Sequence, residues 1–288
     1  MQTTNFITLP DKRQLAYAEY GDPKGHPVLY FHGGISCRLE PLFWGDETIR
    51  RLGLRLISPD RPGIGQSDFQ PNRDFSDWVK DIEFLTDVLG WDKFSILGIS
   101  SGGGYTVACA ALIPDRLNTA IIVSGAWQAS AIEYYPKATR FAWMLTRKFP
   151  WLNLLTLKLE QQSFKKSPEK LSEKFKKRLP PEDYAVLKSP AQIEMLRHNS
   201  NESMHQGVKG VAWDVQLYLQ DWDFCLDEIQ MPLIFFHGEQ DTNIPIALAK
   251  QVVKSLPTAK LSIYPEDGHF SLIVNQFEAI AKALRNNI

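Results

Sequence analysis

Short apolar runs alternate with helix-like stretches over the first part of the chain. Apolar runs predict strands that are buried on both faces, and they lie at residues 27–31, 94–97 and 119–124. A further strand is predicted at 54–58. Alternating runs at 6–9 and 14–20 predict two further strands, while 38–52, 74–89 and 106–112 are predicted to be helices. This alternation predicts an α/β fold with a mainly parallel sheet that helices flank on both faces.

The pattern changes between residues 127 and 226. This stretch contains no convincing buried strand, and it is instead predicted to form helices at 138–148, 152–161, 169–178, 190–206 and 208–220. The α/β pattern then resumes with strands at 231–236 and 261–264 and helices at 244–256 and 271–284. We therefore expect a core made of residues 1–126 and 227–288, with residues 127–226 inserted as a helical cap, or lid, over the carboxyl edge of the sheet.

A serine between glycines follows the strand predicted at 94–97. Residues 98–102 read GISSG, and a helix comes next, which is the context of a G-x-S-x-G nucleophile elbow. Such a turn strains the backbone of Ser100, and side chains at Gly98 and Gly102 would collide with neighbouring chain. The helix points its N-terminal N–H groups toward Ser100, which suits an anionic intermediate. The alternative is a structural turn, because this pattern is common by chance.

Two segments late in the chain offer partners for Ser100. The strand at 231–236 leads into a turn that carries Asp241, and a loop before the last helix carries His269. A serine hydroxyl is a weak nucleophile until a base takes its proton. We predict that His269 is this base, and that Asp241 fixes its tautomer and stabilises the imidazolium.

Other assignments of these roles remain open at this point. Asp241 can instead be the N-cap of the next helix, and Glu239 or Asp267 can be the acid. His269 is the histidine placed late enough in the chain to complete a Ser, Asp, His order. The remaining histidines are expected to be structural or to face solvent: His26, His32, His198, His205 and His237.

An oxyanion hole requires two N–H donors aimed at the charge that develops on the substrate. We expect one from the backbone of Ser101, directly after the nucleophile. The second is expected from the turn after the strand at 27–31, at Gly34 or at Ile35.

Composition and charge restrict the classes of partner. A net charge of −1 leaves no basic surface typical of nucleic-acid binding, and no apolar run is long enough to span a membrane. The N-terminus lacks the basic and apolar regions of a signal peptide. Cys37, Cys109 and Cys225 are widely spaced and are interpreted as reduced thiols. We therefore expect a cytoplasmic protein.

Five motifs occur in the order found in one large superfamily: YFHGG, DRPGIGQSD, LGISSGGGY, HGEQDTNIP and EDGHF. With them the chain resembles the α/β-hydrolases, and within these the capped serine hydrolases. The order Ser100, Asp241, His269 is the order of the triad in that superfamily. The resemblance implies a Ser-His-Asp triad, an acyl-enzyme, and no need for a cofactor or a metal.

Differences from individual groups of the superfamily narrow the range of expected activities. Epoxide hydrolases and haloalkane dehalogenases have an aspartate where Ser100 stands. Proline iminopeptidases usually have Pro-Gly at Ile35-Ser36 and a tryptophan at Ser101, and carbon–carbon bond hydrolases typically have a tryptophan at Phe270. The expected function is hydrolysis of carboxylic esters or related acyl compounds. Acyl transfer, lyase or aminopeptidase-like activity, or ligand binding with little turnover, are the alternatives.

Two features of the predicted cap concern the substrate. A moderately apolar acyl substrate fits the large apolar residues in its first part, although most of these residues are expected to pack the cap onto the core. The basic run over residues 158–178 is expected to be a solvated helix face, with an anionic partner as the less favoured interpretation. The apolar residues are Trp127, Tyr134, Tyr135, Phe141, Trp143, Phe149, Trp151 and Leu154.

Overall fold

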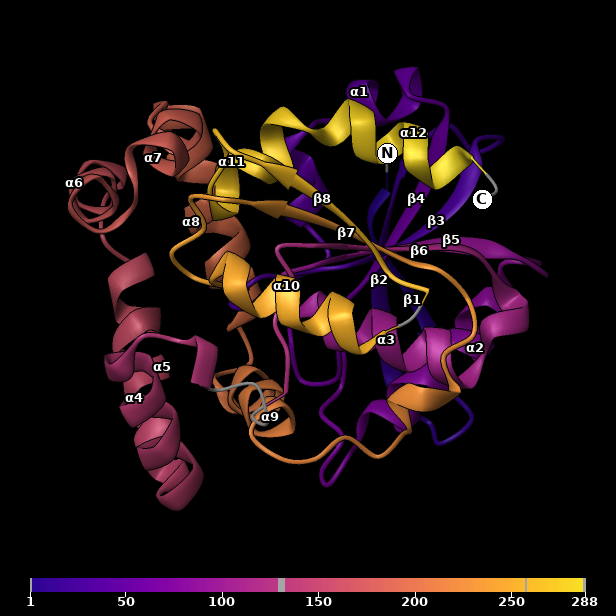
Figure 1. Cartoon of the computed structure of the whole chain (residues 1–288), viewed down its shortest axis with the longest axis horizontal. Helices are drawn as coiled ribbons and strands as arrows, with labels where there is room; N and C mark the ends of the chain where they lie inside the picture. Colours follow the sequence, from indigo (N-terminus) through magenta and orange to yellow (C-terminus); the bar gives the residue numbers. More distant parts are fainter. Residues whose placement is uncertain (1, 129–132, 257, 287–288) are drawn as a thin grey trace.

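The computed structural model describes residues 2–128, 133–256 and 258–286 (Figure 1). Eight strands form one sheet in the order β1-β2-β4-β3-β5-β6-β7-β8. The strands β1 and β2 pair antiparallel, β2 pairs antiparallel with β4, and the remaining pairs are parallel. The strand bounds are β1 Gln2–Thr8, β2 Gln14–Gly21, β3 His26–Phe31, β4 Leu54–Pro59, β5 Phe94–Ile99, β6 Leu117–Val123, β7 Leu233–Gly238 and β8 Lys260–Tyr264.

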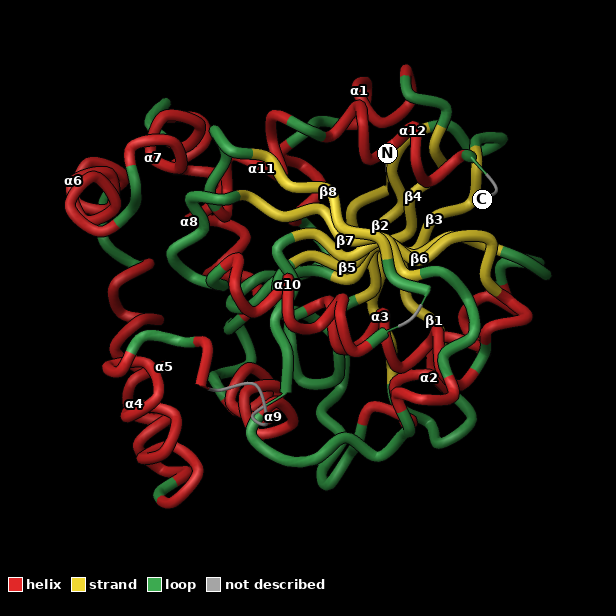
Figure 2. The backbone as a smooth tube through the Cα atoms, viewed as in Figure 1, coloured by secondary structure: helices red, strands yellow, loops and turns green. Residues whose placement is uncertain are grey.

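Helices cover both faces of this sheet, as Figure 2 shows. The apolar sides of α2, α3 and α10 pack on one face, and those of α1 and α12 pack on the other. All six residues of β5 are buried, as the apolar run predicts for a central strand. These helices are α1 Asp46–Arg51, α2 Phe75–Val88, α3 Gly102–Leu112, α10 Ile246–Ser255 and α12 Phe277–Arg285. The mainly parallel α/β sheet predicted from the sequence is confirmed.

Two predicted helices are wrong in their extent. The stretch 38–52 is divided at Gly45, whose φ of 79° separates a short 3₁₀ turn at Glu40–Phe43 from α1. The stretch 271–284 is two helices, α11 (His269–Asn275) and α12, and the first begins at the predicted base. Apolar periodicity runs through both breaks, so it could not locate them.

Among the described residues between β6 and β7 there are six α-helices, and we call them the helical insertion. Figure 1 shows them beside the carboxyl edge of the sheet. The helix α7 was missed in the sequence, and the other five lie near their predicted positions. A separate apolar cluster joins this insertion to the loop after β3, through Cys37 and Leu39. The six are α4 Lys137–Lys148, α5 Pro150–Phe164, α6 Pro168–Arg178, α7 Pro181–Leu187, α8 Pro190–Ser203 and α9 Lys209–Tyr218. The division into a core and a cap at residues 127 and 226 stays a prediction.

No described helix is both long and apolar enough to cross a lipid bilayer.

Candidate active site

Ser100 lies in a sharp turn between β5 and α3. Its φ of 51° is in the left-handed region, where a residue with a side chain is strained. Its amide donates to the carbonyl of Val123 over 2.9 Å, which fixes the turn against β6. A Cβ on Gly98 would lie 2.1 Å from the Thr106 hydroxyl, and one on Gly102 would lie 2.1 Å from the Phe31 carbonyl. The close approach that the GISSG pattern predicts is present.

Asp241 and His269 are joined by a buried hydrogen bond. The distance from His269 Nδ1 to Asp241 Oδ2 is 2.8 Å. Burial lowers the pKa of His269, but the charge of Asp241 and this hydrogen bond outweigh burial and raise the pKa above its ordinary value. The other oxygen of Asp241 accepts from the amides of Asn243 and Ile244, both at 2.8 Å. The carboxylate therefore orients the imidazole and also closes its own turn. It is not the N-cap of the next helix, because α10 begins at Ile246 with Pro245 as its N-cap.

The two alternative acids lie elsewhere. Glu239 is exposed, and Asp267 accepts from the side-chain amides of Asn275 and Gln276 at 2.8 Å each. Of the other histidines, His237 is buried and bonded to the Ile244 carbonyl at 2.8 Å, as expected for a structural residue.

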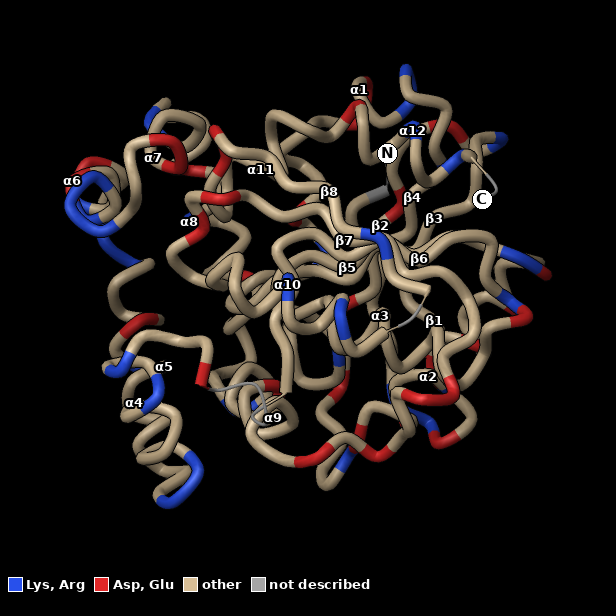
Figure 3. Tube along the Cα trace, viewed as in Figure 1, with Lys and Arg blue, Asp and Glu red and all other residues tan. Residues whose placement is uncertain are grey.

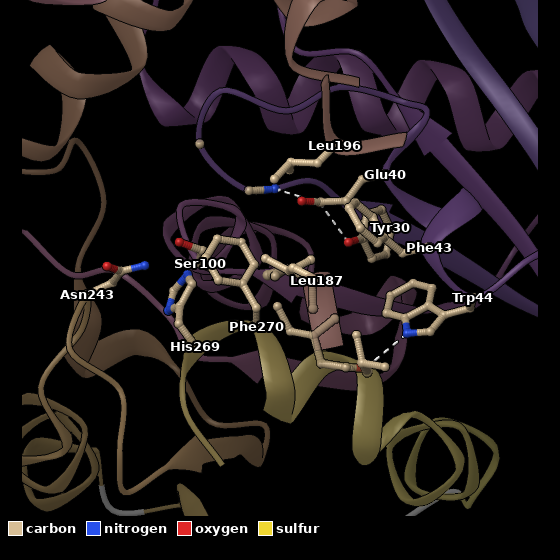
Figure 4. A pocket seen from close by; sticks show the side chains of 15 residues that line it. Tyr30, Glu40, Phe43, Trp44, Ser100, Leu187, Leu196, Asn243, His269 and Phe270 are labelled. Carbon is tan, nitrogen blue, oxygen red and sulfur yellow. Dashed lines mark hydrogen bonds between the residues drawn. The ribbon is translucent and has the colours of Figure 1, made fainter. Parts of the chain in front are cut away.

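Ser100 and His269 line the same cavity, which has a volume of about 190 Å³ (Figure 4). In Figure 4 the His269 ring lies next to Ser100, and Phe270 extends over the apolar side of the cavity. Within the described residues, the side-chain hydrogen bond of His269 is the one to Asp241, and none joins His269 to the Ser100 hydroxyl. The other apolar walls come from Tyr30, Phe43, Trp44, Ile99, Leu187, Leu196, Ile273 and Val274.

The residues expected to supply the oxyanion donors, Gly34 and Ser101, are neighbours in the structure. Gly34 lines the cavity, and a Cβ on Gly34 would lie 3.6 Å from the Ser101 hydroxyl. Ser101 is the residue directly before α3, so its amide lies at the positive end of that helix. The neighbouring amide of Gly33 is already engaged, because it donates to Glu40 Oε2 over 2.8 Å. The role of Gly34 and Ser101 as oxyanion donors stays a prediction.

Glu40 was not expected from the sequence as a residue of the site. Its Oε2 also accepts from the Tyr30 hydroxyl at 2.7 Å, and Figure 4 shows both bonds at the cavity wall. Burial raises the pKa of Glu40 more than its hydrogen bonds lower it. The carboxyl group thus fixes the turn that carries Gly34 and brings one acidic group to a largely apolar wall.

Buried charges join the insertion to the same turn. Arg61 donates to the carbonyls of His32 at 2.6 Å and Gly33 at 3.0 Å, and to Asp214 of α9 at 2.7 Å. Asp214 also pairs with Arg73, and all three side chains are almost fully buried. Burial raises the pKa of Asp214, but the two arginines outweigh burial and keep that pKa below its ordinary value.

Asp183 of α7 is the second residue that the sequence analysis missed. It is buried, and its Oδ2 accepts from the amide of His269 at 3.0 Å. Its Oδ1 accepts from the amides of Phe270 at 2.8 Å and Ser271 at 2.9 Å. A Cβ on Gly268 would lie 2.6 Å from this carboxylate, so the D-G-H sequence leaves room for it. A residue of the insertion therefore caps the helix that begins at the predicted base.

The aromatic residues in the first part of the insertion do not line the cavity beside Ser100. Trp127 and Tyr135 are buried in the main core, as expected for packing residues. Tyr134 and Trp143 also pack against that core, and Leu154 packs against the cluster around Cys37, so most of these residues pack as expected. The exceptions, Phe141, Phe149 and Trp151, are exposed. The apolar walls come instead from the loop after β3, α7, α8 and α11.

Across the described ranges, no three His, Cys, Asp or Glu side chains gather where they could hold a metal ion.

The profile of the α/β-hydrolase fold family matches residues 26–276. A bifunctional esterase/perhydrolase from Acinetobacter calcoaceticus is 23% identical, with 97% of each chain aligned. A proline iminopeptidase from Xanthomonas citri is 24% identical, and the alignment covers 96% of this chain and 94% of that protein. Among solved structures, a thermophilic esterase from Thermogutta terrifontis superposes with a TM-score of 0.67 at 22% identity, over 98% of this chain and 96% of that one. The chain therefore belongs to the α/β-hydrolase fold family and is an enzyme of the hydrolase class.

Proposed function

We propose that this hydrolase cleaves carboxylic esters or related small acyl compounds through an acyl-enzyme on Ser100. The observation that carries the proposal is a serine in a strained elbow that shares a cavity with a histidine bonded to a buried carboxylate. Strain and burial of this kind are maintained where the surrounding structure needs the geometry for chemistry.

In the proposed mechanism, His269 takes the proton of the Ser100 hydroxyl as the oxygen attacks the acyl carbon. The amides of Gly34 and Ser101 hold the oxyanion, and Asp241 stabilises the imidazolium through the 2.8 Å bond. The imidazolium then gives its proton to the leaving alcohol. Water attacks the acyl-enzyme with His269 again as the base, which releases the acid and restores Ser100. None of these steps uses a cofactor.

The insertion is proposed to be the cap of this site. Leu187 and Leu196, from α7 and α8, form part of the cavity wall around Ser100. Most of the remaining wall is apolar, which suits a moderately apolar acyl group.

Labelling with a fluorophosphonate tests the proposal without knowledge of the substrate, because its phosphorus centre resembles the tetrahedral intermediate. We expect the label on Ser100 by mass spectrometry, and nitrophenyl ester hydrolysis that falls by several orders of magnitude in Ser100→Ala. His269→Ala should abolish labelling, whereas His198→Ala, at an exposed histidine of α8, should label normally. Near-normal ester hydrolysis in Ser100→Ala would overturn the assignment.

Aminopeptidase activity is a second candidate, because Glu40 brings a carboxyl group to the cavity wall where it can pair with an amine. The full-length similarity to a proline iminopeptidase points the same way. Comparison of amino-acid nitroanilides with nitrophenyl esters separates the two functions, and we expect the esters to be the better substrates.

A further inference from the structure

The helices α4 and α5 form a hairpin, residues 137–164, that projects from the body of the molecule (Figure 1). No residue of α4, all of which the structure describes, is buried. On α5, the Asn153 amide donates to the Ala212 carbonyl of α9 at 3.3 Å. The buried residues of α5 are Asn153, Leu157, Ser163 and Phe164. Trp143 of α4 is half-buried and packs against Tyr135, with ring centroids 4.9 Å apart. The exposed residues of the two helices make up the outer side of the hairpin.

This outer side is apolar. Six of the ten large hydrophobic side chains that the described residues expose lie in the hairpin, with exposures between 38% and 64%. On α5, Trp151, Leu155 and Leu159 are spaced by four residues, so they share one face of the helix. Exposed apolar side chains are normal singly, but a contiguous group marks an interaction site. The other three are Phe141, Met144 and Phe149.

The hairpin is also basic. It carries five Lys or Arg residues and one acidic residue, a net charge of +4, while the remainder of the chain has a net charge of −5. The helix α4 alone has four basic residues and no acidic one. Figure 3 shows this basic colouring on α4 and α5 against the mixed charges of the sheet and its flanking helices.

We propose that the α4–α5 hairpin docks the enzyme on the surface of an anionic lipid bilayer. Helices that lie in a membrane interface combine Trp, Phe and Leu on one side with Lys and Arg that reach the headgroups. The long basic side chains can extend past the apolar ones to lipid phosphates. The hairpin lies on the bilayer and does not cross it, since neither helix is long and apolar enough to span.

Charge argues against a second copy of this chain as the occupant. A twofold contact places the same patch on both partners. Two hairpins would then bring net charges of +4 and +4 together around an apolar contact. An anionic surface meets the same patch with opposite charge and accepts its apolar side chains.

The position of the hairpin would let docking bring a substrate to Ser100, and this step rests on the proposed function. A second cavity of about 250 Å³ adjoins the one at Ser100, and Gly34, Glu40 and Phe270 line both. Its outer wall includes Glu160 and Phe164 at the end of α5 and three residues of α6. An amphiphilic ester at the bilayer surface would thus reach Ser100 beside the docked hairpin.

Vesicle flotation tests the docking directly and does not depend on turnover. The full chain is mixed with vesicles of phosphatidylcholine, or of phosphatidylcholine with about one third phosphatidylglycerol, at low and high salt. We expect it to float with the anionic vesicles at low salt and to be released by salt, because screening weakens surface attraction. Absence of flotation with anionic vesicles at low salt overturns the proposal.

Two variants separate the apolar and the charged contributions. Trp151→Ser with Leu155→Ser and Leu159→Ser should reduce binding at least about tenfold. Lys137→Gln with Arg140→Gln and Lys148→Gln should remove most of the preference for anionic vesicles, since each basic residue contributes roughly fivefold. Thermal unfolding of both variants should match the parent, because every changed side chain is exposed.

The matched control is Phe6→Ser with Val88→Ser and Leu112→Ser, three exposed apolar residues outside the hairpin. It should float like the parent. If this control loses as much vesicle binding as the serine variant of the hairpin, the proposal is overturned. Light scattering tests whether a second copy of the chain, rather than a bilayer, covers this face. A dimer that the serine variant of the hairpin converts to a monomer would assign this face to self-association and also overturn the proposal.

Discussion

Two parts of the helical insertion meet the rest of the molecule in opposite ways. The helices α7, α8 and α9 are joined to the sheet domain by buried polar contacts, among them Asp183 to the amide of His269 and Asp214 to Arg61. The α4–α5 hairpin has no buried side chain on α4, a helix that the structure describes completely, and exposes six large apolar groups. Buried polar contacts fix one geometry, because any shift leaves a charge or an amide without its partner.

This difference separates two tasks within one insertion. The anchored helices hold the turn that carries Gly34 and the helix that begins at His269, so they determine the geometry of the proposed site. The inner side of α5 joins the apolar cluster around Cys37 through Leu157 and Phe164, whereas the exposed outer residues of the hairpin are available to contact something else. The following experiments test whether the anchored helices and the hairpin differ in this way.

The largest effect is expected at the anchor in α9. Asp214→Ala leaves the guanidinium groups of Arg61 and Arg73 buried without their carboxylate. Removing one partner of a buried ion pair costs about 3–5 kcal/mol, so urea unfolding should show a loss of that size. Asp221→Ala, at an exposed aspartate just beyond α9, is the control and should change little. A loss below about 1 kcal/mol for Asp214→Ala would mean that this network does not hold α9 in place.

Asp183 should affect activity more than stability. Asp183→Ala removes the acceptor for three consecutive amides and lets α11 shift. We expect kcat/KM for a nitrophenyl ester to fall roughly 10- to 100-fold, the cost of a misplaced catalytic group. If kcat/KM stays within twofold while stability falls, Asp183 serves only to pack α7.

Asp183→Asn gives a readout that packing alone would not change. The charge of Asp183 contributes to the raised pKa of His269. His269 must be neutral to act as a base, so activity is lost as pH falls through its pKa. Removing the charge lowers that pKa, and the acidic limb of the pH–rate profile should therefore move to lower pH than in the parent. An unchanged limb would mean that Asp183 acts without its charge.

The activity of the parent enzyme is also predicted to fall at acidic pH. Burial lowers the pKa of His269, but Asp241 outweighs burial and holds the pKa above the ordinary value of 6.5. The midpoint of the acidic limb of kcat/KM should consequently lie above pH 6.5. A midpoint at or below that value would contradict the coupling between His269 and Asp241.

The sequence predicted what depends on local pattern and motif. Buried strands could be predicted from apolar runs, and the strained turn at Ser100 could be predicted from the glycines on either side of it. Asp183 could not be found in this way, because it meets His269 across 86 positions of the chain. The helices of the hairpin were predicted, but the exposure of their apolar residues was missed, since an apolar stripe on a helix has the same spacing whether it packs or faces outward.

The smallest effect is expected in the hairpin. Serine at Trp151, Leu155 and Leu159 removes apolar groups that are already largely in contact with water. Each change should therefore alter the free energy of unfolding by no more than about 0.5 kcal/mol, as for other surface substitutions. Leu157, which is buried on the opposite side of α5, is the matched comparison, and Leu157→Ala should cost about 2–5 kcal/mol. Urea unfolding of the four single variants measures the contrast. If the three outer residues prove as costly as Leu157, the outer face of α5 is packed in solution, and the hairpin belongs with the anchored helices.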